Sequence, residues 1–118
     1  MIEIRLEKLQ ALGASTHDHF VTRAADFLAV HFPERRRRTR EWRPAVESLV
    51  SEGEAIGLVT ERNLAAFAAL RLWCGWSEAA TEAPLWFCEI AASAATPEHR
   101  LFLLRHETSR QYPEGPVR

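Results

Sequence analysis

The segment from Glu61 to about Trp73 is apolar on nearly every side of a helix, with Arg71 as its main polar interruption. Thr60 precedes the segment as a typical N-cap residue, and Gly75 follows it as a typical helix end. A helix that borders solvent along its length shows one apolar stripe, whereas a helix that is apolar all round lies at the centre of a bundle, or at its centre and in an interface. We therefore expect a central apolar helix over about residues 61–74.

The rest of the chain also favours helix over strand. Runs of β-branched residues are absent, and six prolines and five glycines divide the chain into pieces of helical length. The fold class that this predicts is all-α: a single compact bundle of about five helices. Their expected ranges are about 6–31, 44–56, 61–73, 85–95 and 97–110.

The first of these helices should bury one stripe of side chains. Apolar residues recur there at steps of three and four, which is the spacing of one helix face. The expected stripe consists of Leu6, Leu9, Leu12 or Gly13, Phe20, Ala24, Phe27, Leu28 and His31. Pro33 forces the preceding residue out of the helical region, so we expect the helix to stop at Phe32.

The chain of 118 residues fits one domain and is too short for two ordinary ones. We expect residues 1–110 to form this single helical domain. The segment 111–118 contains two prolines and a glycine and is expected to be a flexible C-terminal tail.

The cysteines and the N-terminal residues indicate a cytoplasmic location. Cys74 and Cys88 are the only cysteines, and two reduced thiols are the ordinary interpretation for a cytosolic protein. Charged residues begin at Glu3, so there is no apolar core of a signal peptide. No stretch approaches the roughly 18 apolar residues of a membrane span, and we expect no membrane segment.

Six arginines gather between residues 35 and 43 although the formal net charge is −1. They form either a solvated loop and helix start or a contact with an acidic protein surface, and Arg36, Arg37 and Arg40 are the candidate contact residues. Nucleic acid is a weaker alternative. The helices around residues 46–73 resemble a helix-turn-helix, but the second helix offers few polar side chains for reading base edges.

Aromatic residues cluster near the connection that follows the central helix. Trp76, Trp86 and Phe87 lie there, and Trp42 lies beside the arginines. They either pack in the core or form an interface, because tryptophan and arginine are enriched at interface hot spots. These four aromatic residues are the candidate apolar contacts for a partner.

The sequence predicts no enzyme, no metal and no cofactor. It contains no glycine-rich phosphate loop and no nucleophile placed beside a base. His17 and His19 face different sides of a helix, and His99 and His106 lack an evident third ligand.

The order of elements resembles a family of short helical proteins that are encoded in proteobacteria beside type VI secretion spike, spike-tip and effector genes. The matching pieces span roughly residues 4–106: a long first helix that closes in Phe27–Pro33, then Gly53 through Asn63, an apolar helix ending at Gly75, and a tryptophan, Trp86, eleven residues later. The chain departs from the family at Ile56, where an aromatic residue is usual, and in lacking an Asp-rich connection before Trp86.

The resemblance implies an accessory role: an adaptor or co-chaperone that binds a secreted effector or helps load it onto the spike. One alternative is an immunity protein or antitoxin that blocks a toxin. A second is a DNA-binding regulator that uses the arginines. A third is an enzyme, which would need a pocket that the sequence does not specify. The surplus apolar surface is also compatible with a homodimer.

Overall fold

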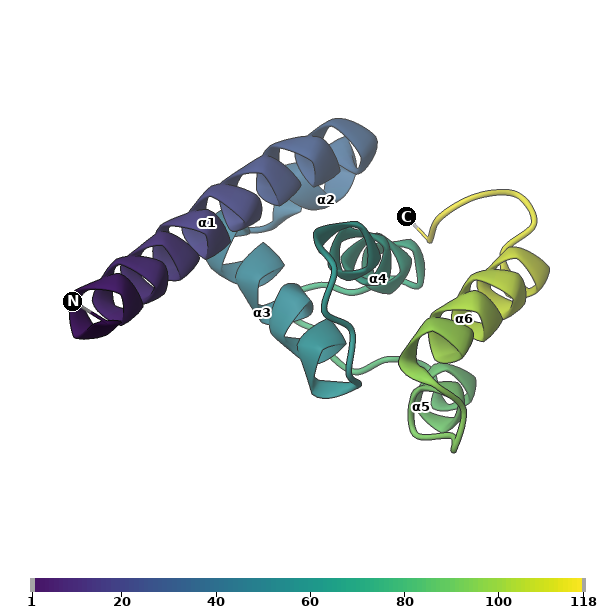
Figure 1. Ribbon diagram of the computed structural model, residues 1–118. Coiled ribbons are helices and arrows are strands. Elements are labelled where there is room, and N and C mark those ends of the chain that lie inside the picture. The colour runs from purple at the N-terminus through teal and green to yellow at the C-terminus, as the bar shows by residue number, and fades with distance from the viewer. Residues whose placement is uncertain (1, 118) are drawn as a thin grey trace.

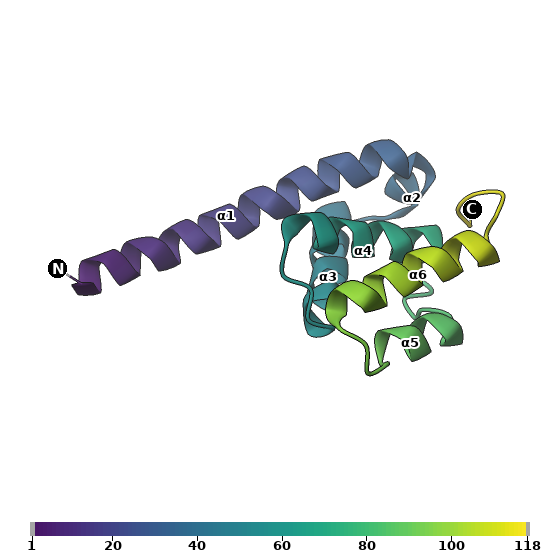
Figure 2. The same ribbon diagram turned by 45° about the vertical axis from the view of Figure 1, so that its right-hand side comes forward.

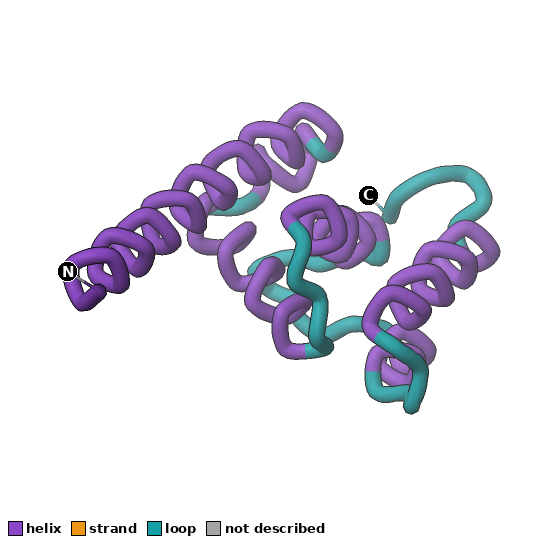
Figure 3. The backbone as a smooth tube through the Cα atoms, in the orientation of Figure 1, coloured by secondary structure: helices purple, strands orange, loops and turns teal. Residues whose placement is uncertain are grey.

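The structure is a computed structural model that describes the backbone of residues 2–117 and the side chains of residues 17–117. Within these residues there are six helices joined by loops, and no strand (Figures 1 and 3). The helices are α1 (Ile2–His31), α2 (Pro33–Arg38), α3 (Trp42–Ala55), α4 (Glu61–Trp73), α5 (Leu85–Ala91) and α6 (Pro97–Gln111). The all-α prediction is confirmed, with one helix more than the five expected.

Helix α4 has the predicted central position and packs against α1, α3 and α6. It begins at the expected residue, because the Thr60 hydroxyl accepts a hydrogen bond from the Asn63 backbone N–H at 3.2 Å. It ends before Gly75, whose φ of 96° is a conformation that glycine adopts without steric cost. Figure 2 shows α3–α6 together on one side of the C-terminal part of α1, whose N-terminal part extends away from them.

Helix α2 is the element that the sequence analysis missed. Pro33 does end α1, as predicted, but it is also the first residue of α2. The first turn of a helix leaves its N–H groups unpaired, so a proline costs nothing there. The break between α1 and α2 is therefore only Phe32, and much of the arginine segment is helical.

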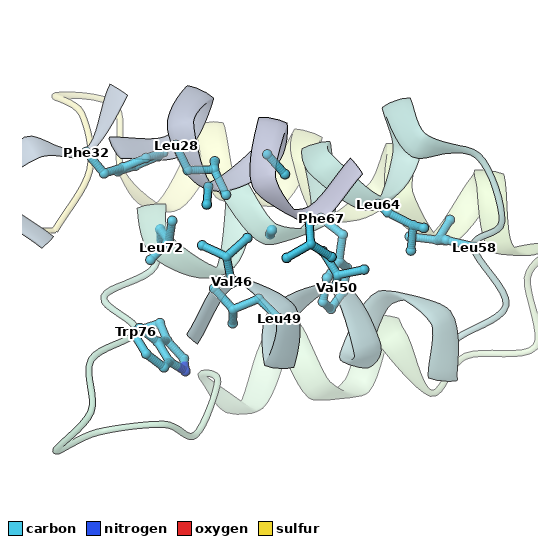
Figure 4. Close-up of a cluster of buried hydrophobic side chains, with 14 of the residues drawn as sticks. Leu28, Phe32, Val46, Leu49, Val50, Leu58, Leu64, Phe67, Leu72 and Trp76 are labelled. Carbon is cyan, nitrogen blue, oxygen red and sulfur yellow. The ribbon is translucent and has the colours of Figure 1, made fainter. Parts of the chain in front are cut away.

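The core lies between α1, α3 and α4. Figure 4 shows Leu28 of α1, Val46 and Leu49 of α3, and Phe67 and Leu72 of α4 side by side in this region, and all five are buried. Burial of a large apolar side chain stabilises a fold by about 1.5–3 kcal/mol relative to its exposure. These contacts therefore fix α4 against its two neighbours.

Helices α3 and α4 approach each other closely at Gly53. A Cβ atom at this position would lie 3.1 Å from Leu64 Cδ2 and 3.2 Å from Phe67 Cδ1. Glycine therefore lets the two helices pack without displacing these side chains. The sequence predicted that helix α3 starts at about Pro44. It begins two residues earlier, at Trp42.

Helices α5 and α6 pack against each other, and α6 also packs against α4. The N-cap of α6 is the predicted one: the Thr96 hydroxyl accepts a hydrogen bond from the His99 backbone N–H at 3.3 Å. Helix α5 ends at Ala91, earlier than the expected Ala95, and a turn follows in which the Ser93 N–H donates to the Ile90 carbonyl.

The predicted stripe of α1 is correct only in part. Phe20, Ala24 and Leu28 are buried, but Phe27 is 51% exposed and His31 is exposed as well. The buried stripe also runs through Val21, Ala25 and Leu28, which places its centre away from Phe27 and His31. These two residues therefore lie at its edge. Leu6, Leu9, Leu12 and Gly13 lie outside the residues whose side chains the structure describes.

The C-terminal segment after α6 turns back toward α2 and the end of α4 (Figure 1). The Val117 N–H donates to the Trp73 carbonyl at 2.9 Å, and the Arg35 guanidinium donates to the Val117 carbonyl at 2.8 Å. The segment was expected to be a flexible tail, and its mobility stays a prediction. The structure shows that its last described residue bonds to two helices.

Candidate interaction surface

Three of the four aromatic residues predicted as partner contacts are core residues. Trp42 and Trp76 are each 6% exposed, and Phe87 is 2% exposed. Trp42 Nε1–H donates to the Ala25 carbonyl at 2.8 Å, and the Phe87 ring lies 5.7 Å from that of Phe67. Their burial corrects the expectation that these side chains are available to a partner.

Trp86, the fourth predicted aromatic contact, is half-buried on α5. Its ring centroid lies 5.7 Å from that of Phe87 and 6.4 Å from that of Tyr112. It thus connects α5 to the end of α6, and only part of its ring is left to meet a partner.

The three predicted arginine contacts are all exposed. Arg37 is paired with Glu34, and the backbone N–H of Arg40 donates to a Glu78 carboxylate oxygen at 2.8 Å. Arg36 forms no ion pair among the described side chains. The arginine segment therefore keeps cationic groups at the surface, as the sequence predicts.

Exposed apolar side chains lie near the C-terminal end of α1. Phe27 is 51% exposed and Val30 is 76% exposed. The Phe27 ring lies 4.4 Å from the His31 ring, and residues three and four apart are neighbours on a helix surface. Phe27, Val30 and His31 therefore form one continuous patch, which we call the α1 patch.

A cavity of about 500 Å³ adjoins the α1 patch through His31. Its wall is apolar in one part and charged in another, and the C-terminal segment closes one side. The lining residues are His31, Phe32, Pro33, Glu34, Arg35, Arg38, Pro116 and Val117. We call this feature the α2 cavity.

Arg35 is the least exposed charged residue of the α2 cavity, at 9%. Burial, with a smaller effect from the positive charge of Arg38, lowers the pKa of Arg35 from its ordinary value. The carbonyl of Val117 is neutral and compensates the charge only in part. Arg35 Nε–H is buried and has no acceptor among the described atoms.

Other exposed apolar side chains lie apart from the α2 cavity lining. Val59 before α4, Leu85 at the start of α5 and Phe102 on α6 are 79%, 75% and 62% exposed. Single exposed apolar residues are normal on a protein surface, whereas the α1 patch is contiguous and lies beside a charged cavity.

Arg71 has a structural role that sequence reasoning missed. Its side chain is 3% exposed, and it donates to both carboxylate oxygens of Glu52, at 3.0 and 3.2 Å. It also donates to the Thr81 carbonyl and lies 5.8 Å from the centre of the Phe87 ring. This buried charge of the apolar helix thus joins α3, α4, α5 and the loop that connects α4 to α5. The sequence did contain a signal for this role, because a charged residue in a buried helix requires a partner. Spacing alone does not identify Glu52 as that partner.

The two cysteines are free and lie in different surroundings. Burial raises the pKa of the Cys74 thiol, and this outweighs the opposing effects of the Thr108 hydroxyl at 3.8 Å and the Arg71 charge. Cys88 is exposed. A thiol with a raised pKa carries less thiolate near neutral pH and is a weaker nucleophile.

The described residues contain no group of three or more His, Cys, Asp or Glu side chains arranged to hold a metal ion. None of the described helices is both long enough and apolar enough to cross a membrane.

The fold and surface together define an all-α protein with a contiguous apolar patch beside a cationic cavity. No protein-family model, curated protein or solved structure matches the chain.

Proposed function

We propose that this protein is a non-catalytic accessory factor that acts in the cytoplasm by binding another protein. The observation that carries the proposal is the α1 patch, where Phe27 and Val30 are 51% and 76% exposed, together with the adjoining α2 cavity, which is lined by Arg35 and Arg38. Apolar anchors next to arginine side chains are characteristic of interface hot spots.

The partner class follows from the resemblance to accessory proteins of type VI secretion. A secreted effector or a component of the spike is the partner that this resemblance suggests, and the role is that of an adaptor or co-chaperone. The apolar side chains would supply most of the affinity. The exposed arginines would mainly increase the association rate and the specificity, because surface charges steer an encounter more than they strengthen the complex.

The experiment that tests this proposal is co-purification. The tagged protein is co-expressed with its genomic neighbours, washed at high salt and sized by light scattering. A stoichiometric complex with a neighbouring effector or spike component supports an adaptor. A homodimer without such a partner refutes it.

A pair of matched variants shows whether the α1 patch forms the contact. Phe27→Ser should weaken the complex, because it removes a half-exposed ring from the α1 patch. Phe102→Ser removes a ring of similar exposure on α6 and should leave the complex intact. Equal weakening by both variants would place the contact elsewhere.

Two further measurements separate the alternatives. Growth of cells that produce the partner, measured with and without this protein, distinguishes an adaptor from an immunity protein. Only an immunity protein is expected to suppress the toxicity of its partner. A DNA-binding regulator would bind DNA with an affinity that falls steeply as salt rises, whereas an apolar interface responds little.

A further inference from the structure

We propose that the α2 cavity binds a carboxylate side chain of the partner protein, set within an apolar segment of that protein. This inference rests on the proposed function and names the chemistry of the group that is recognised. Three features of the site support it: the charge balance of the cavity, its apolar wall and its connection to the α1 patch.

The α2 cavity has more cationic than anionic groups. Two arginines, Arg35 and Arg38, line it, and Glu34 is the one carboxylate among its lining residues. Glu34 is already engaged, since it pairs with Arg37 and lies 3.9 Å from Arg38. Among the described residues, no carboxylate therefore remains to pair with Arg35, and an anionic group would complement the charge of this cavity.

Arg35 is the residue of the α2 cavity that would gain most from an anionic partner. Arg35 is only 9% exposed, yet it forms no ion pair with a described side chain. One nitrogen donates to the neutral Val117 carbonyl, and its Nε–H lacks an acceptor. A buried guanidinium gains more from a nearby carboxylate than an exposed one does, because water screens it less.

The remainder of the lining favours a protein segment over a phosphate chain. Phe32, Pro33, Pro116 and Val117 form an apolar wall, and His31 connects this wall to Phe27. A nucleic acid backbone presents successive phosphates and would leave this wall without a partner. A carboxylate flanked by aliphatic side chains matches both parts of the surface.

The direct test uses two peptides that differ in one group: acetyl-Leu-Glu-Leu-amide and acetyl-Leu-Gln-Leu-amide. Each is titrated into the full chain, and NMR follows the Arg35 Nε–H and the Val117 backbone N–H. We expect the Glu peptide to shift both signals and to bind about tenfold or more tighter than the Gln peptide, the loss expected for one charge-assisted hydrogen bond.

Two charge-reversal variants make the test specific. Arg38→Glu places a negative charge on the α2 cavity and should abolish the preference for the Glu peptide. Arg105→Glu makes the same change in net charge on the exposed face of α6 and should leave the preference intact. Both side chains are exposed, so both variants should fold.

Several results would overturn the proposal. Equal affinity for the two peptides, an absence of shifts, or an equal effect of the two variants would each remove the carboxylate site. Tighter binding of an oligothymidylate at the same signals would assign the α2 cavity to nucleic acid instead.

The failure of this inference is distinguishable from the failure of the proposed function. A co-purified complex that survives Arg38→Glu unchanged rejects the carboxylate site and leaves the adaptor. Selective peptide binding in a protein that captures no neighbour rejects the adaptor and leaves the carboxylate site.

Discussion

The ion pair between Arg71 and Glu52 leads to an asymmetric prediction about stability. The Arg71 side chain is 3% exposed and that of Glu52 is 42% exposed, so the two charges depend on each other to different degrees. We expect Glu52→Ala, at a half-exposed position, to destabilise the protein more than Arg71→Met, a change at a buried position.

The magnitudes follow from what each change leaves behind. Glu52→Ala leaves the buried guanidinium with the Thr81 carbonyl as its remaining acceptor, and an under-compensated buried charge costs about 2–4 kcal/mol. Arg71→Met keeps an apolar stem of similar length against Phe87, while water solvates the carboxylate of Glu52. We expect that change to cost about 1 kcal/mol.

Urea denaturation followed by far-UV circular dichroism gives both free energies of unfolding. Glu54→Ala is the matched control, because Glu54 lies on the same helix, is exposed and forms no ion pair among the described side chains. It should change stability by less than about 0.5 kcal/mol. The reasoning is refuted if Arg71→Met is the more damaging change, or if Glu52→Ala behaves like the control.

Four further predictions concern individual residues. Gly57→Ala should cost about 1–3 kcal/mol in urea denaturation, because φ is 97° and the new Cβ would lie 2.7 Å from Pro97 Cγ. Trp42→Phe should cost about 1–2 kcal/mol in the same assay, since it removes the 2.8 Å hydrogen bond from Nε1 to a carbonyl of α1. Burial raises the pKa of Cys74, so the folded state keeps a proton that the unfolded state loses, and stability should fall as the pH rises above the ordinary thiol pKa. A thiol-reactive dye should also label the exposed Cys88 before Cys74.

Local signals in the sequence predicted most of the helix boundaries. Thr60 and Thr96 accept the capping hydrogen bonds expected of them, and α4 and α6 begin where these caps indicate. Pro33 predicted only the end of a helix, whereas a proline that ends one helix can also begin the next. A six-residue helix is too short to show a periodic pattern, so α2 could not be recognised.

The interaction surface was less predictable than the fold. Composition placed Trp42 and Phe87 in either the core or an interface, and only the three-dimensional packing decides between these. Phe27 matched the buried stripe by spacing, but whether a residue at the edge of a stripe is covered depends on the neighbouring helices. The arginines were predicted to be exposed from charge alone, whereas the burial of Arg35 results from the C-terminal segment folding over it.

The hydrogen bond between Arg35 and the Val117 carbonyl also bears on how the chain folds. Three of the packed pairs, α1 with α2, α3 with α4 and α5 with α6, are neighbours in sequence, and contacts of this kind form quickly. The Arg35–Val117 contact joins residues 82 positions apart, and closing so long a loop in an unfolded chain has a high entropic cost. We therefore expect it to form last in folding and to open first in the native state. Hydrogen exchange at the Val117 amide would then be fast relative to exchange in α4.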